Sequence, residues 1–156
     1  MRPLENLLQK YDKLFFVDTE TTGFSSERDR IIELAAIGIK QGNNGPYHHS
    51  EYDSLIKLPE YSRVPEKITE LTGISDNDLL LQGEMEQYVA SEFCSMISGG
   101  KTLLIAHNAR FDVKFLNAML ERQCSAYHLW HLDYLDTLKV YRNRVLKNHK
   151  LSDAIA

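Results

Sequence analysis

Two acidic side chains directly follow a short apolar run near the start of the chain. Leu14 to Val17 form the run, and Asp18 and Glu20 come next, in front of Thr21-Thr22-Gly23. Residues two apart in an extended chain project to one face, so these carboxylates would repel each other unless a cation lay between them. Hard oxygen ligands suit Mg²⁺ or Mn²⁺ rather than zinc. A bare Asp-x-Glu is more often a turn cap beside a solvated side chain, but the preceding strand and the following turn favour a metal site.

A second polar group follows another apolar run, Thr102 to Ala106. It reads His107-Asn108-Ala109-Arg110-Phe111-Asp112, and Asn108 is a favourable residue for capping a helix that begins there. Asn108 and Asp112 are four residues apart and would share a helix face, beside an apolar stripe that includes Phe111. Taken alone, an Asp in the first turn of a helix is more often favoured by the helix dipole than by a metal ion.

The remaining patterns place both groups in one α/β domain. They predict an antiparallel meander of three strands, then helices, and then further strands that alternate with helices, which together make a mixed sheet flanked by helices. The C-terminal ends of the strands would bring Asp18 and the 106–112 turn into a common crevice. The expected strands are 14–17, 30–40, 47–58, 102–106 and 131–135, and the expected helices are 65–71, 85–97, 108–122 and 137–145.

Charge is unevenly distributed along the chain, which has a net charge of −4. Residues 1–100 carry 9 basic and 17 acidic side chains, whereas residues 101–150 carry 9 basic and 4 acidic ones. The stretch from Lys139 to Lys150 is basic throughout, and Arg142 and Lys147 are its expected phosphate contacts. An acidic metal site beside a basic surface would have this distribution, although an ordinary charged helix surface would also explain the basic stretch.

Composition excludes several classes of protein. A chain of 156 residues that is 43% hydrophobic is long enough for one domain with a core and too short for two ordinary ones. It has no apolar run of about 18 residues, so no membrane span is expected, and its first residues lack the apolar core of a signal segment. Cys94 and Cys124 lie in apolar helical patterns, which are typical of buried thiols in a cytoplasmic protein.

Together the motifs resemble those of a known family. Residues 16–24, Phe-Val-Asp-Thr-Glu-Thr-Thr-Gly-Phe, resemble the first motif of the DEDD superfamily of 3′→5′ exonucleases, in its DEDDh subgroup, and residues 107–112 resemble the second. Residues 68–74 and 136–138 resemble segments of the bacterial DNA polymerase III proofreading domains, of the epsilon and PolC types. The resemblance covers about residues 13–156 and implies a ribonuclease H-like fold.

The resemblance also implies a role for each matching residue. Asp18 would bridge two metal ions, Glu20 would contact one ion and the terminal 3′ hydroxyl, and Asp112 would bind the second ion. A metal-activated water would attack the last phosphodiester and release a nucleoside monophosphate. The expected substrate-binding residues are Thr19, Thr22, Gly23, Phe24, His107, Asn108 and Phe111.

The family's third motif is a His and an Asp separated by four residues, which supply the general base and complete the metal cage. It would follow residues 136–138, and it does not occur there within the 156 residues. The pairs His128 with Asp133 and His131 with Asp136 have the spacing, but they stand too early and are interpreted as loop or strand residues. We therefore expect a single domain, 1–156, that is incomplete at its C-terminus, keeps three of four metal carboxylates and has impaired activity.

Three hypotheses follow for function. The leading one is an exonuclease that uses Mg²⁺ or Mn²⁺ and acts on nucleic acid with a free 3′ end, with DNA favoured over RNA and a replicative polymerase as a candidate partner. The second keeps the fold and trims RNA, because the sequence does not discriminate the sugar. The third is a nuclease-like module that grips 3′ ends or a polymerase without cutting, and the missing motif favours it.

Overall fold

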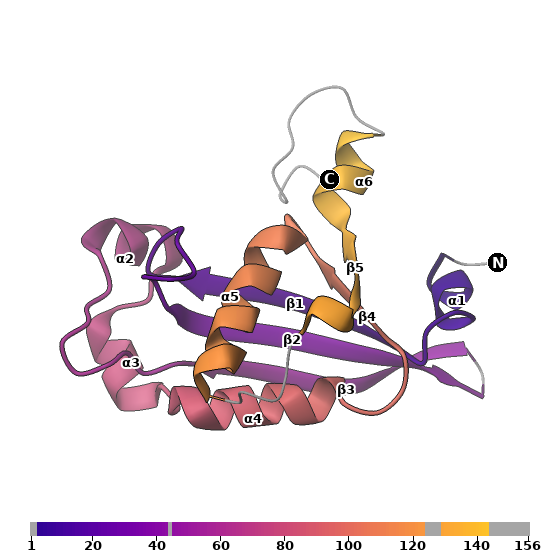
Figure 1. Ribbon diagram of the computed structural model, residues 1–156, viewed down its shortest axis with the longest axis horizontal. Helices are drawn as coiled ribbons and strands as arrows, with labels where there is room; N and C mark the ends of the chain where they lie inside the picture. The colour runs from indigo at the N-terminus through magenta and orange to yellow at the C-terminus, as the bar shows by residue number, and fades with distance from the viewer. Residues whose placement is uncertain (1–2, 44, 124–128, 144–156) are drawn as a thin grey trace.

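Five strands form one mixed sheet in the order β3-β2-β1-β4-β5 (Figure 1). The strands are β1 (Lys13–Thr21), β2 (Ile31–Gly42), β3 (Gly45–Leu55), β4 (Thr102–Ala106) and β5 (Asp133–Asp136). β1, β2 and β3 pair antiparallel, whereas β4 runs parallel to β1 and β5 runs parallel to β4. The computed structural model describes residues 3–43, 45–123 and 129–143. The expected α/β fold, a meander followed by parallel strands, is confirmed.

Helices lie against the sheet and at both of its ends. They are α1 (Pro3–Leu8), α2 (Glu66–Thr72), α3 (Asp76–Gln82), α4 (Glu86–Ile97), α5 (Ala109–Gln123) and α6 (Thr137–Arg142), with a 3-10 turn at Leu129–His131. In Figure 1, α4 and α5 lie in front of the strands, α2 and α3 lie at the end of the sheet away from α1, and β5 with α6 extends beyond the other elements.

The alternation of side chains along β1 divides the apolar core between the two faces of the sheet. Phe15 and Val17 belong to the main core cluster with residues of α4 and α5, and the rings of Phe15 and Phe93 meet edge to face at 6.1 Å. Leu14 belongs to a separate cluster with Leu8 of α1. Because successive residues of a strand point to opposite faces, Asp18 lies on the face of Leu14, where it is exposed.

Two helices were not expected from the sequence. α3 begins with a capping box, in which the Ser75 hydroxyl accepts a hydrogen bond from the Asp78 backbone N–H and the Asp78 carboxylate accepts one from the Ser75 N–H. A Ser-x-x-Asp in front of three leucines is the sequence pattern that indicates this start. α1 has six residues, which is too short to show helical periodicity.

Two further expectations are settled only in part. The helix expected over 137–145 is present as α6 up to Arg142, and residues 144 and 145 lie outside the described part of the chain. Cys94 is buried in the main core, as expected, whereas Cys124 is outside the described residues. Among the helices that the structure describes, none is both long and apolar enough to cross a bilayer.

We expect Gly38→Ala to destabilise the sheet. An added Cβ at Gly38 would lie 2.4 Å from the Ser50 hydroxyl oxygen and 3.0 Å from the Phe15 ring, so the core would have to shift. Overpacking of this kind lowers the free energy of unfolding by about 1–3 kcal/mol, which urea unfolding measures. Ile37→Ala, at a neighbouring side chain that is 42% exposed, is the control and should change stability less. Equal midpoints for Gly38→Ala and the parent chain would contradict the prediction.

Candidate active site

The two polar groups found in the sequence follow neighbouring parallel strands. β1 and β4 pair in parallel, with Phe16 beside Ile105, so their C-terminal ends lie at the same edge of the sheet. Asp18 and Glu20 lie in the last part of β1, and α5 begins three residues after β4 ends. The expectation that Asp18 and the 106–112 turn lie together at one edge of the sheet is confirmed, whereas the expected crevice between them stays a prediction.

A pair of hydrogen bonds joins the first group to the second. The backbone N–H and the hydroxyl of Thr19 both donate to Oδ1 of Asp112, at 3.1 and 2.8 Å. Asp112 is only 3% exposed and lies in the first turn of α5. Thr19 is likewise buried, so its hydroxyl holds the carboxylate of α5 in place against β1. Its expected role as a substrate contact stays a prediction.

Burial makes the Asp112 carboxylate an unfavourable charge. It is the largest cause of a pKa raised from 3.8 to about 6; the charge of Asp18 adds to the rise, and the hydrogen bonds from Thr19 oppose it. Asp18 is therefore near enough to Asp112 for the two charges to interact. A carboxylate in this position is stabilised by protonation or by a nearby cation.

Further acidic side chains gather beside Asp18 across three strands. Glu20 of β1 lies directly opposite Glu33 of β2, and Asp18 and Asp53 both flank Ala35 in the register. Burial raises the pKa of Glu20, and Asp18 adds to the rise. Burial likewise raises the pKa of Glu33, with further contributions from Asp53, Glu20 and Asp18. Like charges directly opposite each other destabilise a sheet.

These residues fit a hard divalent cation by their electrostatics. Burial raises the pKa of Glu20 and of Asp112, and the charge of Asp18 adds to both rises, so a cation beside these carboxylates would relieve both effects. Among the described residues, no three His, Cys, Asp or Glu side chains converge in the geometry of metal ligands. The fit therefore rests on charge and burial, and the assignment of the three ligands stays a prediction.

The turn between β4 and α5 has an unusual backbone that β5 holds in place. Asn108 has a φ of 65°, in the left-handed region, so it is not the ordinary helix cap that the sequence suggested. Its N–H donates to Oδ1 of Asp136 at 3.0 Å, and the same oxygen accepts the N–H of Leu138 at 3.0 Å. Asp136 thus fixes the turn and caps α6 with one oxygen. From the sequence, Asp136 belongs to a family segment and is interpreted as a loop or strand residue, and this role is not predicted.

A hydroxyl at the start of α6 anchors the turn that carries His107. Thr137 Oγ1 donates to the carbonyl of Ala106 at 3.2 Å and lies 3.2 Å from Nδ1 of His107. These contacts join the end of β4 and the His107 ring to α6.

A folded loop after β1 presents Phe24 to solvent. Thr22 closes the loop, because its N–H donates to the carbonyl of Arg30 and its hydroxyl accepts the Arg30 N–H. The Asp29 carboxylate accepts the Ser25 N–H at 2.8 Å and packs where a Cβ on Gly23 would lie, 2.5 Å away. Only glycine fits there without a shift. Phe24 at the tip is 89% exposed.

Phe24 and the second motif meet at an open pocket. The ring of Phe24 lies edge to face with Phe111 at 6.4 Å, and Phe111 packs on Phe115 at 4.8 Å. The pocket, of about 460 Å³, is lined by these rings and by Asn108 among others. The structure therefore brings together Phe24, Asn108 and Phe111, three of the expected substrate-binding residues. Of the expected phosphate contacts, Arg142 is exposed in α6, and Lys147 lies outside the described residues.

Comparison with known proteins identifies the family. Residues 15–155 match the RNase T family of exonucleases. The chain belongs to this exonuclease family.

Relatives of the RNase T-family chain include DNA polymerase III proteins. It is 36% identical over 141 residues to the DNA polymerase III PolC-type protein of Halalkalibacterium halodurans, which covers 86% of this chain and 9% of that protein. It is 38% identical over 103 residues to the DNA polymerase III subunit epsilon of Treponema pallidum, which covers 66% of this chain and 44% of that protein. The chain thus spans less than half the length of these relatives.

Solved structures share the fold of this RNase T-family chain. Escherichia coli exonuclease I, in complex with a dT13 oligonucleotide, superposes with a TM-score of 0.73 at 23% identity, over 85% of this chain and 29% of that one. A zinc-bound form of the exonuclease I complex with single-stranded DNA superposes equally well. These likenesses confirm the ribonuclease H-like fold that the sequence motifs implied.

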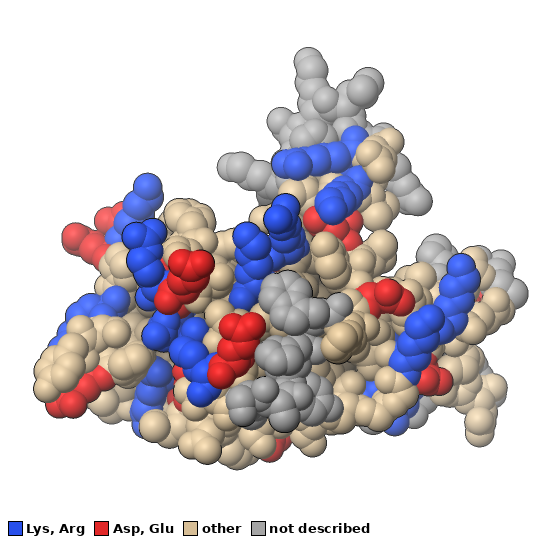
Figure 2. Space-filling view, viewed as in Figure 1, with Lys and Arg blue, Asp and Glu red and all other residues tan. Residues whose placement is uncertain are grey.

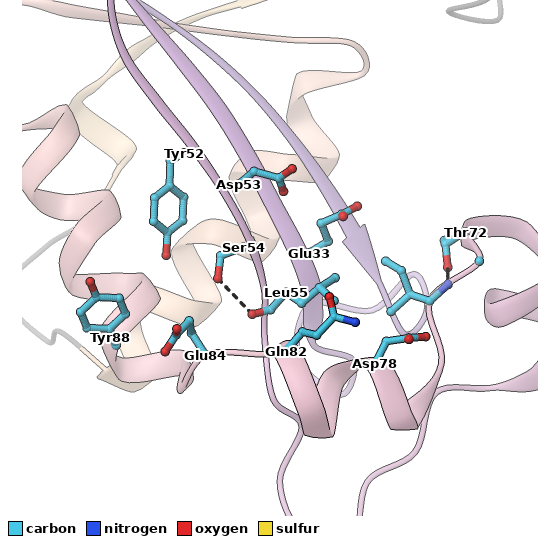
Figure 3. Close-up of a pocket in the computed structure, with 12 residues that line it drawn as sticks. Glu33, Tyr52, Asp53, Ser54, Leu55, Thr72, Asp78, Gln82, Glu84 and Tyr88 are labelled. Carbon is cyan, nitrogen blue, oxygen red and sulfur yellow. Dashed lines mark hydrogen bonds between the residues drawn. The ribbon is translucent and has the colours of Figure 1, made fainter.

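A second cavity borders the acidic group near Asp18 through Glu33 and Asp53. It has a volume of about 720 Å³ and opens beside the edge strand β3, with lining residues from β2, α2, α3 and α4 (Figure 3). Glu33 and Asp53 point to the same side in Figure 3, and Asp78 and Glu84 also line the cavity. This acidic lining would repel phosphate. We therefore place the candidate nucleic-acid site at the smaller pocket beside Phe24.

We expect Asp112→Asn to stabilise the metal-free protein at neutral pH. The folded-state pKa of about 6 lies above 3.8, so the folded state binds the proton more tightly and stability falls as pH rises from about 4 to 6. At pH 7 the ionised group costs up to about 3 kcal/mol. Asn cannot ionise and keeps an oxygen for Thr19. Urea unfolding in EDTA should show a gain of about 1–3 kcal/mol at pH 7 and little at pH 4. A loss of stability at pH 7 would contradict this.

We expect Asp136→Ala to loosen the turn at Asn108. The substitution removes the acceptor of two backbone N–H groups, whereas Asp136→Asn keeps an oxygen there. Loss of such a cap lowers the free energy of unfolding by about 0.5–2 kcal/mol. Hydrogen exchange in residues 106–112 should quicken for Ala and much less for Asn. Ser75→Ala, which removes the cap of α3, is the control and should lose stability without faster exchange in residues 106–112.

Proposed function

We propose that this chain is the exonuclease domain of a proofreading or repair enzyme, which removes nucleotides from the 3′ end of single-stranded DNA with Mg²⁺ or Mn²⁺. One observation carries the proposal. The hydrogen bonds from Thr19 to Asp112 join the two exonuclease motifs at the sheet edge, beside Asp18 and Glu20. The relatives support a DNA substrate and a replicative polymerase as partner, because they are DNA polymerase III proteins.

Each residue of the site has a task in this proposal. Asp18, Glu20 and Asp112 would hold the divalent ions, which supply a nucleophilic water and stabilise the leaving oxygen when they are bound. Thr19 orients Asp112 through two hydrogen bonds. Asp136 and Thr137 orient the turn that carries His107 and Asn108. Phe24 and Phe111 offer aromatic surface on which the bases of a single strand can stack.

The negative charge of the carboxylates affects how a nucleic-acid strand can bind at the site. The acidic group around Asp18 repels the phosphates of a strand until cations neutralise it. We therefore infer that binding of the strand's 3′ end at the carboxylates depends on divalent metal, whereas binding at the aromatic rings does not. This separates two steps, capture of the strand and hydrolysis of its last bond.

We expect metal-dependent shortening of a 5′-labelled single strand from its 3′ end. The assay uses protein in excess over the oligonucleotide, so that slow hydrolysis is still detected, with Mg²⁺, Mn²⁺ or EDTA. A ladder of products should appear with either metal and disappear with EDTA. Asp18→Asn and Glu20→Gln should each slow shortening by at least about 100-fold, because each removes a charged group from the metal site.

Matched reactions distinguish the alternatives. Gln87→Ala, on α4 outside the site, is the control and should cut like the parent chain. An RNA strand of the same sequence tests whether the enzyme prefers ribose or deoxyribose. If RNA is shortened faster than DNA, RNA is the preferred substrate. Shortening that persists in EDTA, or that Asp18→Asn leaves unchanged, would refute the proposed function.

A further inference from the structure

The pocket beside Phe24 has two walls of different chemistry. One wall is aromatic and comes from Phe24, Phe111 and Phe115. The other is cationic and comes from Arg110 and Lys114 on α5, and Glu27 is the one acidic residue among those that line the cavity. A cavity of about 460 Å³ that is lined both by aromatic rings and by positive charge suits a flat group attached to an anion.

The cationic wall has a defined geometry. Arg110 and Lys114 are four residues apart in α5, so they project from one face of the helix. Both are exposed, and no hydrogen bond or ion pair of either side chain with another described residue is present in the structure. In Figure 2, basic side chains lie over the N-terminal part of α5 and over α6.

The aromatic wall is unusual in its exposure. Phe24 is 89% exposed although its ring meets Phe111 edge to face, so most of its ring surface is available to a ligand. The hydrogen bonds of Thr22 and Asp29 hold the loop that carries it. A rigidly presented and solvated aromatic ring is the kind of platform on which an unpaired base stacks.

We propose that Arg110 and Lys114 bind a backbone phosphate of a single strand, next to the nucleotide whose base stacks on Phe24. This inference rests on the proposed function and adds two residues that the motifs do not assign. The pocket would recognise a base and a phosphate together, without reading the base, because every base has a stacking face and the cations contact only the backbone. It would hold the strand whether or not metal is bound at the carboxylates.

The test measures binding of a labelled dT oligonucleotide to the full 156-residue chain in EDTA, by anisotropy over a range of salt concentrations. Arg110→Ala with Lys114→Ala should weaken binding and lower the slope of log affinity against log salt by roughly 0.7, since each neutralised phosphate on a single strand contributes about 0.7 and the two cations share one phosphate. Phe24→Ala should weaken binding about 5- to 100-fold at every salt concentration with the slope unchanged, because stacking releases no counterions. Phe24→Trp should retain binding.

The control is Lys10→Ala with Lys67→Ala, which removes the same charge at exposed positions outside the pocket. If it lowers the slope as much as the α5 pair does, general charge explains the binding and the inference is overturned. An unchanged affinity for Phe24→Ala would also overturn it. The result distinguishes this inference from the proposed function. If the chain does not hydrolyse DNA in Mn²⁺ but the variants weaken binding as expected, only the proposed function is contradicted. If the chain hydrolyses DNA but the variants do not weaken binding, only this inference is contradicted.

Discussion

The contact between Thr19 and Asp112 is the interaction on which the site depends. It joins a β1 residue to a helix that begins 90 residues later in the chain, and it lies where both are buried. The two hydrogen bonds offset part of the cost of burying a carboxylate, although not enough to restore its ordinary pKa. The same two hydrogen bonds therefore hold α5 against the sheet and place a buried carboxylate with a raised pKa at the sheet edge.

Local patterns were sufficient to predict most of the fold and the common location of the two motifs at one edge of the sheet. The apolar runs before Asp18 and His107 are short and continuous because β1 and β4 are central strands, and such strands are recognisable without tertiary information. The same holds for the ends of α2 and α4, which glycines mark. α3 was not predicted from the sequence, although its capping box is a local pattern. α1 was not predicted either, because it is too short to show helical periodicity.

Long-range partners could not be predicted in this way. Glu33 and Asp53 join the acidic group only because of the register of β2 against β1 and of β3 against β2. Asp136 reaches Asn108 only because β5 pairs with β4. Neither relation leaves a mark in the spacing of residues. The left-handed backbone of Asn108 was also missed, because its residue type fits an ordinary helix cap equally well.

The hydrogen bond between Asn108 and Asp136 bears on the order in which parts of the protein form. Its two ends are 28 residues apart, and a loop of that length closes only at an entropic cost. α5 and β4 are adjacent in sequence and can associate early, whereas the turn between them acquires its partner only after β5 has paired with β4. β5 is the last described strand in the sequence, so during synthesis the turn between β4 and α5 acquires this acceptor only after β1 to β4 and α5 have been made.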